Sequence, residues 1–177
     1  MHVNRTEHIS LMATYNQWMN LKIYEAARRL GDEALLADRG AFFSSIIGTL
    51  NHLALGDTVW LKRFAQHPAG YSALAPLSTL DTPQRLNQLA FADIRELEAY
   101  RTWLDQIIID WAQSISEPQL EQRLHYRNMR GVVAEKNFYG LIVHFFNHQT
   151  HHRGQATTLL SQAGQDVGIT DLLALID

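Results

Sequence analysis

The chain has 177 residues, of which 46% are apolar and 19% are charged, and its formal net charge is -3. A chain of this length can bury one hydrophobic core, so we expect a single domain over residues 1–177. Binders of nucleic acid usually carry a clustered basic patch, which this sequence lacks, so nucleic acid is not an expected partner.

The sequence contains no cysteine, which excludes a disulfide, a thiolate metal site and a cysteine nucleophile. The first residues lack the apolar stretch of a secretory signal peptide. No apolar run approaches the roughly 18 residues that indicate a membrane span. These features predict a soluble, cytoplasmic protein that has no membrane partner.

Four long segments show the apolar period of an α-helix. The first covers residues 7–30 and the second covers residues 44–66. A long connection with three prolines follows, which suits a bundle with a crossover better than a tight hairpin. The third helix is expected to begin at Asp81-Thr82-Pro83, because a capping side chain followed by proline is typical of a helix start, and to end near residue 114.

The segment 122–137 has two short arms around Gly131, which predicts a short β-hairpin with the glycine in its turn. The fourth helix covers residues 138–162, and the apolar tail 172–176 could dock on the bundle or on a partner. The elements together predict an all-α four-helix bundle with a long crossover connection and a short hairpin before the last helix.

Nine histidines are present, and four of them lie between His144 and His152. His148 and His152 are one turn apart and fall in the apolar stripe of the last helix, so both should point into the core. Two imidazoles at this spacing can bind one metal ion, and burial of both rings without a shared partner would be costly. His144 and His151 fall on the flank of the stripe, and we expect hydrogen bonding or a place at a pocket mouth for them.

A third ligand would have to come from another helix. The candidates are His8 on the apolar face of the first helix, and His52 and Asp57 on the second. Helical spacing does not choose among these three. Asp57 could accept a hydrogen bond from a ligand imidazole, or it could be a buried carboxylate paired with arginine or tryptophan, which is the preferred interpretation.

Other polar residues near these positions have simpler interpretations. Asn147 and Gln155 could accept a hydrogen bond from a ligand imidazole, as Asp57 could. Arg153 falls away from the apolar stripe and is expected in an ion pair or a dimer contact. His67 and His125 lie in predicted loops, and we assign no role to them.

Three motifs resemble those of the DinB family of bacterial helical-bundle proteins. Residues 144–155 read HFFNHQTHHRGQ, and the last helix of the family typically carries HxxNHxxxHRGQ. Residues 50–60 read LNHLALGDTVW, where the family has a ligand histidine followed by aspartate and tryptophan. Residues 15–20 read YNQWMN, similar to the first helix of the family. These matches span nearly the whole chain in the family's order, and the last-helix motif is the specific one.

The resemblance implies a four-helix bundle of up-down-down-up order with a divalent-metal site of three histidines. Carried over to this sequence, the ligands are His52, His148 and His152. Three neutral imidazoles leave coordination positions open to water or substrate, which is the pattern of catalytic sites. Imidazole suits zinc, nickel and iron alike, so the sequence does not choose the ion. Similar proteins commonly form homodimers.

Bundles similar to this one include metal-dependent transferases and isomerases that use a low-molecular-weight thiol. The resemblance therefore predicts a thiol or another small molecule as a substrate, although no second catalytic residue stands out. The alternative is a non-catalytic metal-binding protein of the stress response, in keeping with the damage-inducible expression from which the family takes its name. A bundle whose buried histidines bind no metal is the third possibility.

Overall fold

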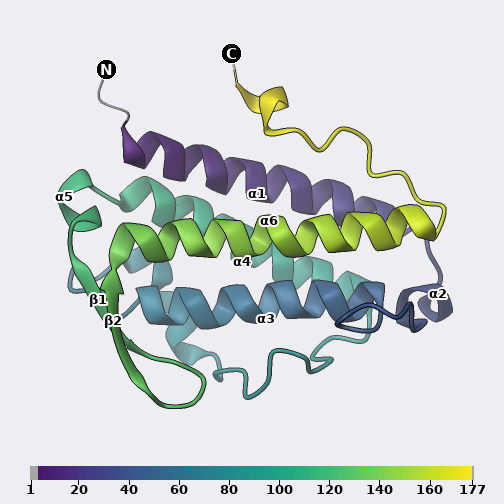
Figure 1. Cartoon of the computed structure of the whole chain (residues 1–177), viewed down its shortest axis with the longest axis horizontal. Helices are drawn as coiled ribbons and strands as arrows, with labels where there is room; N and C mark the ends of the chain where they lie inside the picture. The colour runs from purple at the N-terminus through teal and green to yellow at the C-terminus, as the bar shows by residue number, and fades with distance from the viewer. Residues whose placement is uncertain (1–3, 177) are drawn as a thin grey trace.

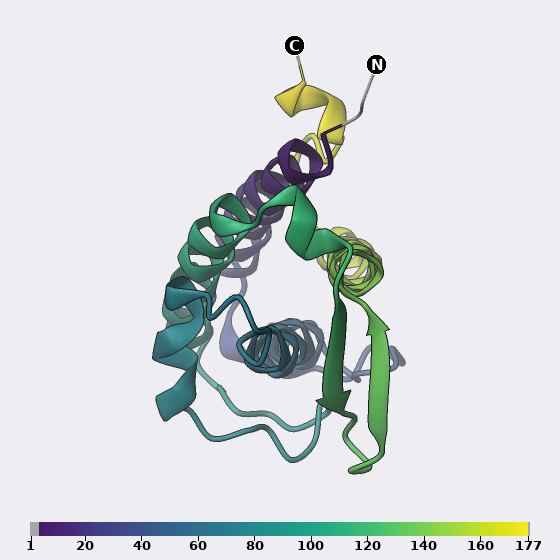
Figure 2. The same ribbon diagram turned by 90° about the vertical axis from the view of Figure 1, so that its left-hand side faces the viewer.

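The computed structural model describes residues 4–176, and four long helices form the body of this part of the chain (Figure 1). These helices are α1 (Arg5–Ala27), α3 (Ile46–Phe64), α4 (Ile94–Ser114) and α6 (Phe138–Gln162). α1 and α6 run in one direction and α3 and α4 in the other, which confirms the up-down-down-up order. α1 packs against α4 and α6, and α3 packs against the same two helices (Figure 2).

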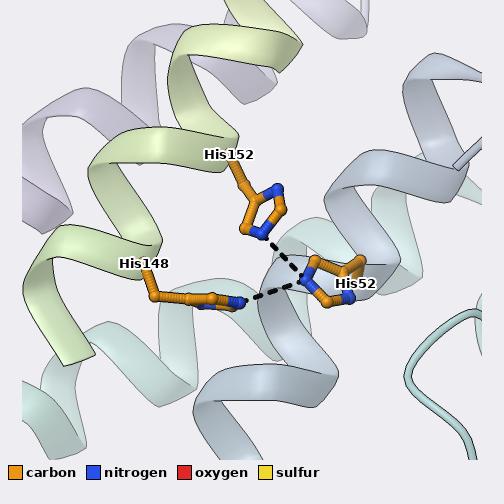
Figure 3. A group of neighbouring side chains, drawn as sticks. All are labelled: His52, His148 and His152. Carbon is orange, nitrogen blue, oxygen red and sulfur yellow. Dashed lines mark hydrogen bonds between the residues drawn. The ribbon is translucent and has the colours of Figure 1, made fainter. Parts of the chain in front are cut away.

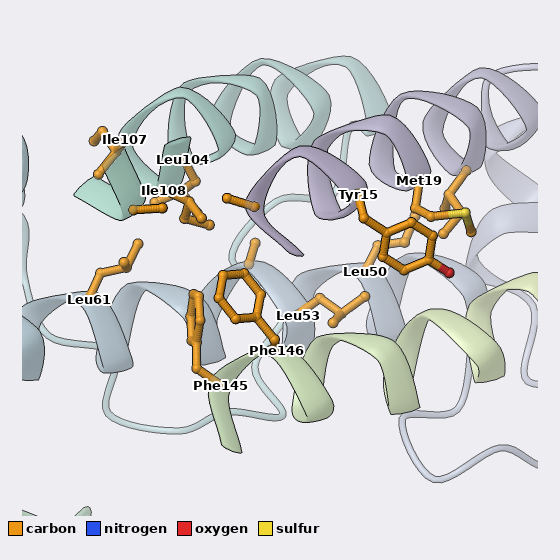
Figure 4. Packing of buried hydrophobic residues seen from close by; sticks show 14 of the residues in the cluster. Tyr15, Met19, Leu50, Leu53, Leu61, Leu104, Ile107, Ile108, Phe145 and Phe146 are labelled. Carbon is orange, nitrogen blue, oxygen red and sulfur yellow. The ribbon is translucent and has the colours of Figure 1, made fainter. Parts of the chain in front are cut away.

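The hydrophobic core lies between these four helices and draws on each of them (Figure 4). Met19, Leu50, Leu104 and Phe145 are all buried there. Such a core forms because apolar residues recur at the helical period on one side of every helix, and burial of their surface drives the helices together.

Polar caps set the starts of three of the helices. Asn4 caps α1, Ser45 caps α3 and Asn137 caps α6, and each side chain accepts a hydrogen bond from a backbone N–H of the first turn. The predicted bounds of the first two helices differ from these by two or three residues at each end. Those of the last helix are confirmed.

The predicted start of the third helix at Asp81-Thr82-Pro83 is wrong, because α4 begins at Ile94 with Asp93 as its cap. Residues 80–93 are held in a non-helical form by α3. Asn51 donates to the carbonyl oxygen of Phe91 and accepts from the N–H of Phe91, both at 2.9 Å. Tertiary hydrogen bonds therefore override the local capping signal.

The connection between the parallel helices α3 and α4 is the expected long crossover, and it contains the 3₁₀ helix η1 (Ser72–Thr79). Three further short helices are α2 (Asp32–Leu36), α5 (Glu117–Leu120) and η2 (Leu172–Leu175). None of these short elements was predicted. η2 lies in the apolar tail and contacts α1, and just before the tail Tyr15 donates to the carbonyl oxygen of Thr170 at 2.7 Å.

The predicted hairpin is confirmed as β1 (Arg123–Arg127) paired antiparallel with β2 (Val133–Asn137). Gly131 adopts a positive φ of 76° in the turn, a conformation that glycine adopts without a steric cost. Leu124 pairs with Lys136, and Tyr126 pairs with Ala134. Directly paired residues share one face of a hairpin, and the burial of Leu124 identifies this face as the one toward the bundle.

No helix among residues 4–176 is both long enough and apolar enough to cross a membrane.

A buried polar network ties the helices together inside the bundle. Arg101 on α4 pairs with Asp57 on α3 at 2.5 Å and with Asp105 one turn along α4 at 2.9 Å. Asn16 and Asn20 on α1 donate to Asp105 at 2.8 and 2.9 Å. Buried charges are tolerated only when they are paired and hydrogen-bonded, so this network constrains how the helices pack.

Removal of the central cation should destabilise the fold strongly. We expect Arg101→Ala to lower the free energy of unfolding by about 3–5 kcal/mol, because two buried carboxylates lose their counter-charge. Urea denaturation at pH 7 measures this loss. The control is Arg95→Ala, which removes an exposed arginine from the same helix and should change stability by about 0.5 kcal/mol or less. Equal effects of the two substitutions would contradict the importance of the network.

Candidate metal centre

Three histidine side chains from α3 and α6 converge in the structure (Figure 3). The Nε2 atom of His52 lies 3.1 Å from Nε2 of His148 and 3.1 Å from Nε2 of His152. Imidazole nitrogens that bind one zinc ion lie about 2.0–2.1 Å from it, so two of them lie within about 4.2 Å of each other. Both measured separations meet this condition.

Hydrogen bonds to the other ring nitrogens determine which nitrogens carry protons. Nδ1 of His52 lies 3.0 Å from the carbonyl oxygen of Leu86, which can only accept, so Nδ1 holds the proton. Nδ1 of His152 donates in the same way to Oε1 of Gln155 at 2.7 Å. The Nε2 atoms of His52 and His152 therefore face each other with lone pairs. A shared cation would satisfy both, and a hydrogen bond between them would not.

The ring of His148 joins this donor set through its Nε2 atom, 3.1 Å from Nε2 of His52. Its Nδ1 atom is buried and has no hydrogen-bond partner among the described residues, so no hydrogen bond at that nitrogen orients the ring. Burial lowers the pKa of His148 to about 3, with a further contribution from the neighbouring His152, and burial lowers the pKa of His52 to about 4. Burial also lowers the pKa of His152. All three rings are neutral at pH 7, which is the form that binds a metal ion, so this group could hold one.

Two glycines of α3, one turn before and one turn after His52, allow this close packing. A Cβ atom on Gly56 would lie 3.0 Å from Cε1 of His148. A Cβ atom on Gly48 would overlap the carbonyl oxygen of Phe43. The ring of Phe43 can therefore stack on His52, with centroids 3.9 Å apart and planes 17° apart. Phe43 covers one side of the histidine group.

The residues expected at the flank of the site are found there. The ring of His144 lies 5.0 Å from that of Trp60, at the edge of the histidine group. His151 is exposed and accepts a hydrogen bond from Gln155 at 3.4 Å. Gln155 thus holds His152 as the sequence suggested, whereas Asn147 is exposed and holds no ligand ring.

Two of the alternative ligands lie elsewhere. His8 is exposed on α1, so its expected place on the apolar face is wrong. Asp57 accepts from Arg101 at 2.5 Å and from Nε2 of Gln149 at 2.9 Å, which agrees with the interpretation as a paired carboxylate. The structure thus brings together His52, His148 and His152 but neither of these two.

The expected ion pair or dimer contact of Arg153 is wrong. Arg153 is buried, because α1 packs on this face of α6. Its guanidinium donates to Asn16 and Thr150 and lies 5.2 Å from the ring centroid of Tyr15. Among the described residues, no carboxylate lies within 4.0 Å of it. Arg153 therefore belongs to the polar interior of the bundle.

Two further histidines, His67 and His125, lie away from the site. His67 is buried against Phe138, with ring centroids 4.2 Å apart, and its Nδ1 accepts from the N–H of Ala69. His125 is exposed on the hairpin, 3.4 Å from Glu135. Neither belongs to the group of three histidines.

Sequence reasoning missed Phe43, Leu86 and the two glycines. The spacing of Gly48 and Gly56, four residues on each side of His52, was the signal that could have identified them. Phe43 and Leu86 lie in irregular segments, where no periodic pattern places a side chain or a carbonyl group.

Comparison with known proteins gives two matches. The family model described as DinB family matches residues 1–177. A protein of Bacillus subtilis (strain 168) named Protein DinB is 29% identical over 157 residues, which cover 89% of this chain and 87% of that protein. No solved structure matches the chain.

A methyl group at Gly56 should disturb the candidate metal centre. We expect Gly56→Ala to weaken Zn²⁺ binding by about tenfold or more, the effect typical of a change that reorients a ligand ring, because the ring of His148 must move. Competition with a chromogenic zinc chelator measures the affinity. The matched control is Gly154→Ala on α6, where a Cβ meets nothing within 4 Å. The idea fails if both substitutions leave the affinity unchanged.

Proposed function

The chain belongs to the DinB family, and on that premise we propose that His52, His148 and His152 bind one divalent metal ion. The observation that carries the proposal is the pair of unprotonated Nε2 atoms of His52 and His152, which face each other at 3.1 Å. Zinc, nickel and iron all suit three imidazole ligands.

We further propose that the site serves a thiol-dependent transferase or isomerase. A divalent ion held by three protein ligands keeps positions open and lowers the pKa of a thiol bound to it. Among the described residues, no fourth histidine or carboxylate joins the group. In the transfer reaction the thiol sulfur would form a bond to an electrophilic carbon, the leaving group would depart with its electron pair, and the thiol proton would pass to solvent.

The residues of the chain would orient and enclose the reactants. The carbonyl group of Leu86 and the side chain of Gln155 fix the rings of His52 and His152, so that both Nε2 atoms stay aimed at the centre. Phe43 covers His52 and keeps water from that side. A thiol would therefore have to approach from a side that Phe43 does not cover.

Metal content tests the ligand assignment. Untagged protein should contain about one divalent ion per chain by elemental analysis, since three histidines with one open coordination position form a single site. The double variant His148→Ala, His152→Ala should lose the ion. The matched control is His144→Ala, His151→Ala, which removes two exposed flanking histidines of the same helix and should keep it. Full metal content in the first double variant would refute the assignment.

The second candidate function is a non-catalytic metal-binding protein. One observation favours it: the groups that fix or cover the three rings are Phe43, Leu86 and Gln155, and none of them transfers a proton at pH 7. The two neighbouring histidines, His144 and His151, are exposed at the edge of the group. A homodimer, a cytoplasmic location and damage-inducible expression also stay predictions.

Thiol binding distinguishes the two functions. Protein loaded with Co²⁺ should gain a sulfur-to-metal absorption band on addition of glutathione or cysteine, because the open position accepts a thiolate. It should also speed the transfer of that thiol to 1-chloro-2,4-dinitrobenzene, with release of chloride. S-methylglutathione, which has no free thiol, is the control. If neither thiol produces an absorption band or turnover, the result supports the non-catalytic function.

A further inference from the structure

A second feature of the structure is a cavity of about 470 Å³ between the hairpin, α3 and the start of α6. Its lining includes Trp60 from α3, Tyr126 and Lys136 from the hairpin, and Leu141 and His144 from α6. Cavities of about 300–1,000 Å³ are typical of small-molecule sites. The cavity is therefore large enough for a small organic ligand.

The cavity lies beside the candidate metal centre. His144 precedes His148 by one turn of α6, and the centroids of the two rings are 6.2 Å apart. On α3, Trp60 lies two turns after His52 and 5.0 Å from the ring of His144. A molecule in the cavity would thus be separated from the three histidines by little more than one imidazole ring.

The walls of the cavity suit a planar apolar group. The rings of Trp60 and Tyr126 lie 5.6 Å apart and are tilted by 54°, and Leu141 adds an aliphatic surface. Aromatic side chains present large rigid surfaces on which another ring can stack or pack edge to face.

The charges beside the cavity are positive. Lys136 pairs with Leu124 across the hairpin, so it lies on the face toward the bundle. The guanidinium of Arg63 lies 4.6 Å from the ring centroid of Trp60 and 5.2 Å from that of Tyr126. Within 4.0 Å of these two cations, the described part of the chain places no carboxylate.

The acidic residue of the hairpin, Glu135, does not neutralise these cations. Glu135 lies on the opposite face, where it pairs with Arg123 at 3.0 Å. Burial lowers the pKa of Arg63, as expected for a cation that loses water without gaining a carboxylate. Two cations next to an apolar cavity complement a ligand that is apolar and negatively charged.

We propose that this cavity binds the second substrate of the transfer reaction, a small molecule in which a planar apolar group carries a carboxylate that faces Lys136, with the positive charge of Arg63 behind the aromatic walls. Its role as a substrate site rests on the proposed function, whereas its ability to bind such a molecule does not. The aromatic walls would hold the apolar group, and the cations would orient the molecule relative to the histidine group.

A pair of isosteric probes tests the proposal in the full-length protein. The probes are 2-naphthoate and its uncharged counterpart 2-naphthamide, added to protein with its metal and after metal removal. The naphthoate should bind about tenfold more tightly, since only its charged form gains an ion-paired hydrogen bond. It should shift the indole N–H resonance of Trp60, identified with Trp60→Phe, and leave that of Trp18 in place.

Substitutions distinguish the charge of the cavity from other effects. Lys136→Gln should reduce the preference for naphthoate to about threefold or less, because it removes the cation that lines the cavity. The matched control is Lys22→Gln, which removes a lysine that stacks on Trp18 at 4.3 Å, and it should keep the preference.

Three results would overturn the proposal. Equal affinity for the two probes would show that the charge of the ligand does not matter. An unchanged preference in Lys136→Gln would show that Lys136 does not recognise the carboxylate. Binding of naphthoate only to metal-loaded protein would place the carboxylate on the ion instead. The variant His148→Ala, His152→Ala should still bind naphthoate, so the cavity can be confirmed even if the metal assignment fails.

Discussion

The proton on Nδ1 of His52 is the constraint on which the candidate site depends. The carbonyl group of Leu86 fixes that proton, so the lone pair on Nε2 must point at His148 and His152. This arrangement needs α3, α6 and the crossover connection in place at once. The connection is therefore part of the site. Its non-helical form at Leu86 leaves the carbonyl oxygen of that residue free to accept the hydrogen bond from His52.

The register between α3 and α6 is set by the polar interior beside the histidines. Gln149 follows His148 in the chain and donates to Asp57, five residues after His52, at 2.9 Å. Arg153 follows His152 and donates to Asn16 on α1. The last-helix motif thus serves two purposes. His148 and His152 belong to the candidate metal centre, and the residues directly after them join a buried network that links α6 to the other three long helices.

Periodic sequence patterns correctly predicted the regular helices and the hairpin, because regular secondary structure places apolar residues at fixed intervals. The long helices, the hairpin around Gly131 and the inward positions of His148 and His152 follow from spacing alone. His52 could not be chosen over His8 and Asp57 by spacing, because burial of one helix face does not say which partner lies opposite. The start of α4 was missed because Asn51 holds Phe91 through contacts between segments 40 residues apart in sequence.

The two hydrogen bonds between Asn51 and Phe91 of the crossover connection would affect the rate at which the histidine group exchanges protons and ions. Asn51 lies one residue from His52, and the same connection supplies the carbonyl group of Leu86. Brief opening of this segment would free Nδ1 of His52 and let the ring exchange its proton between the two nitrogens. Exchange of the ion proposed for this site would then depend on the opening of a surface segment, while the four long helices could stay packed.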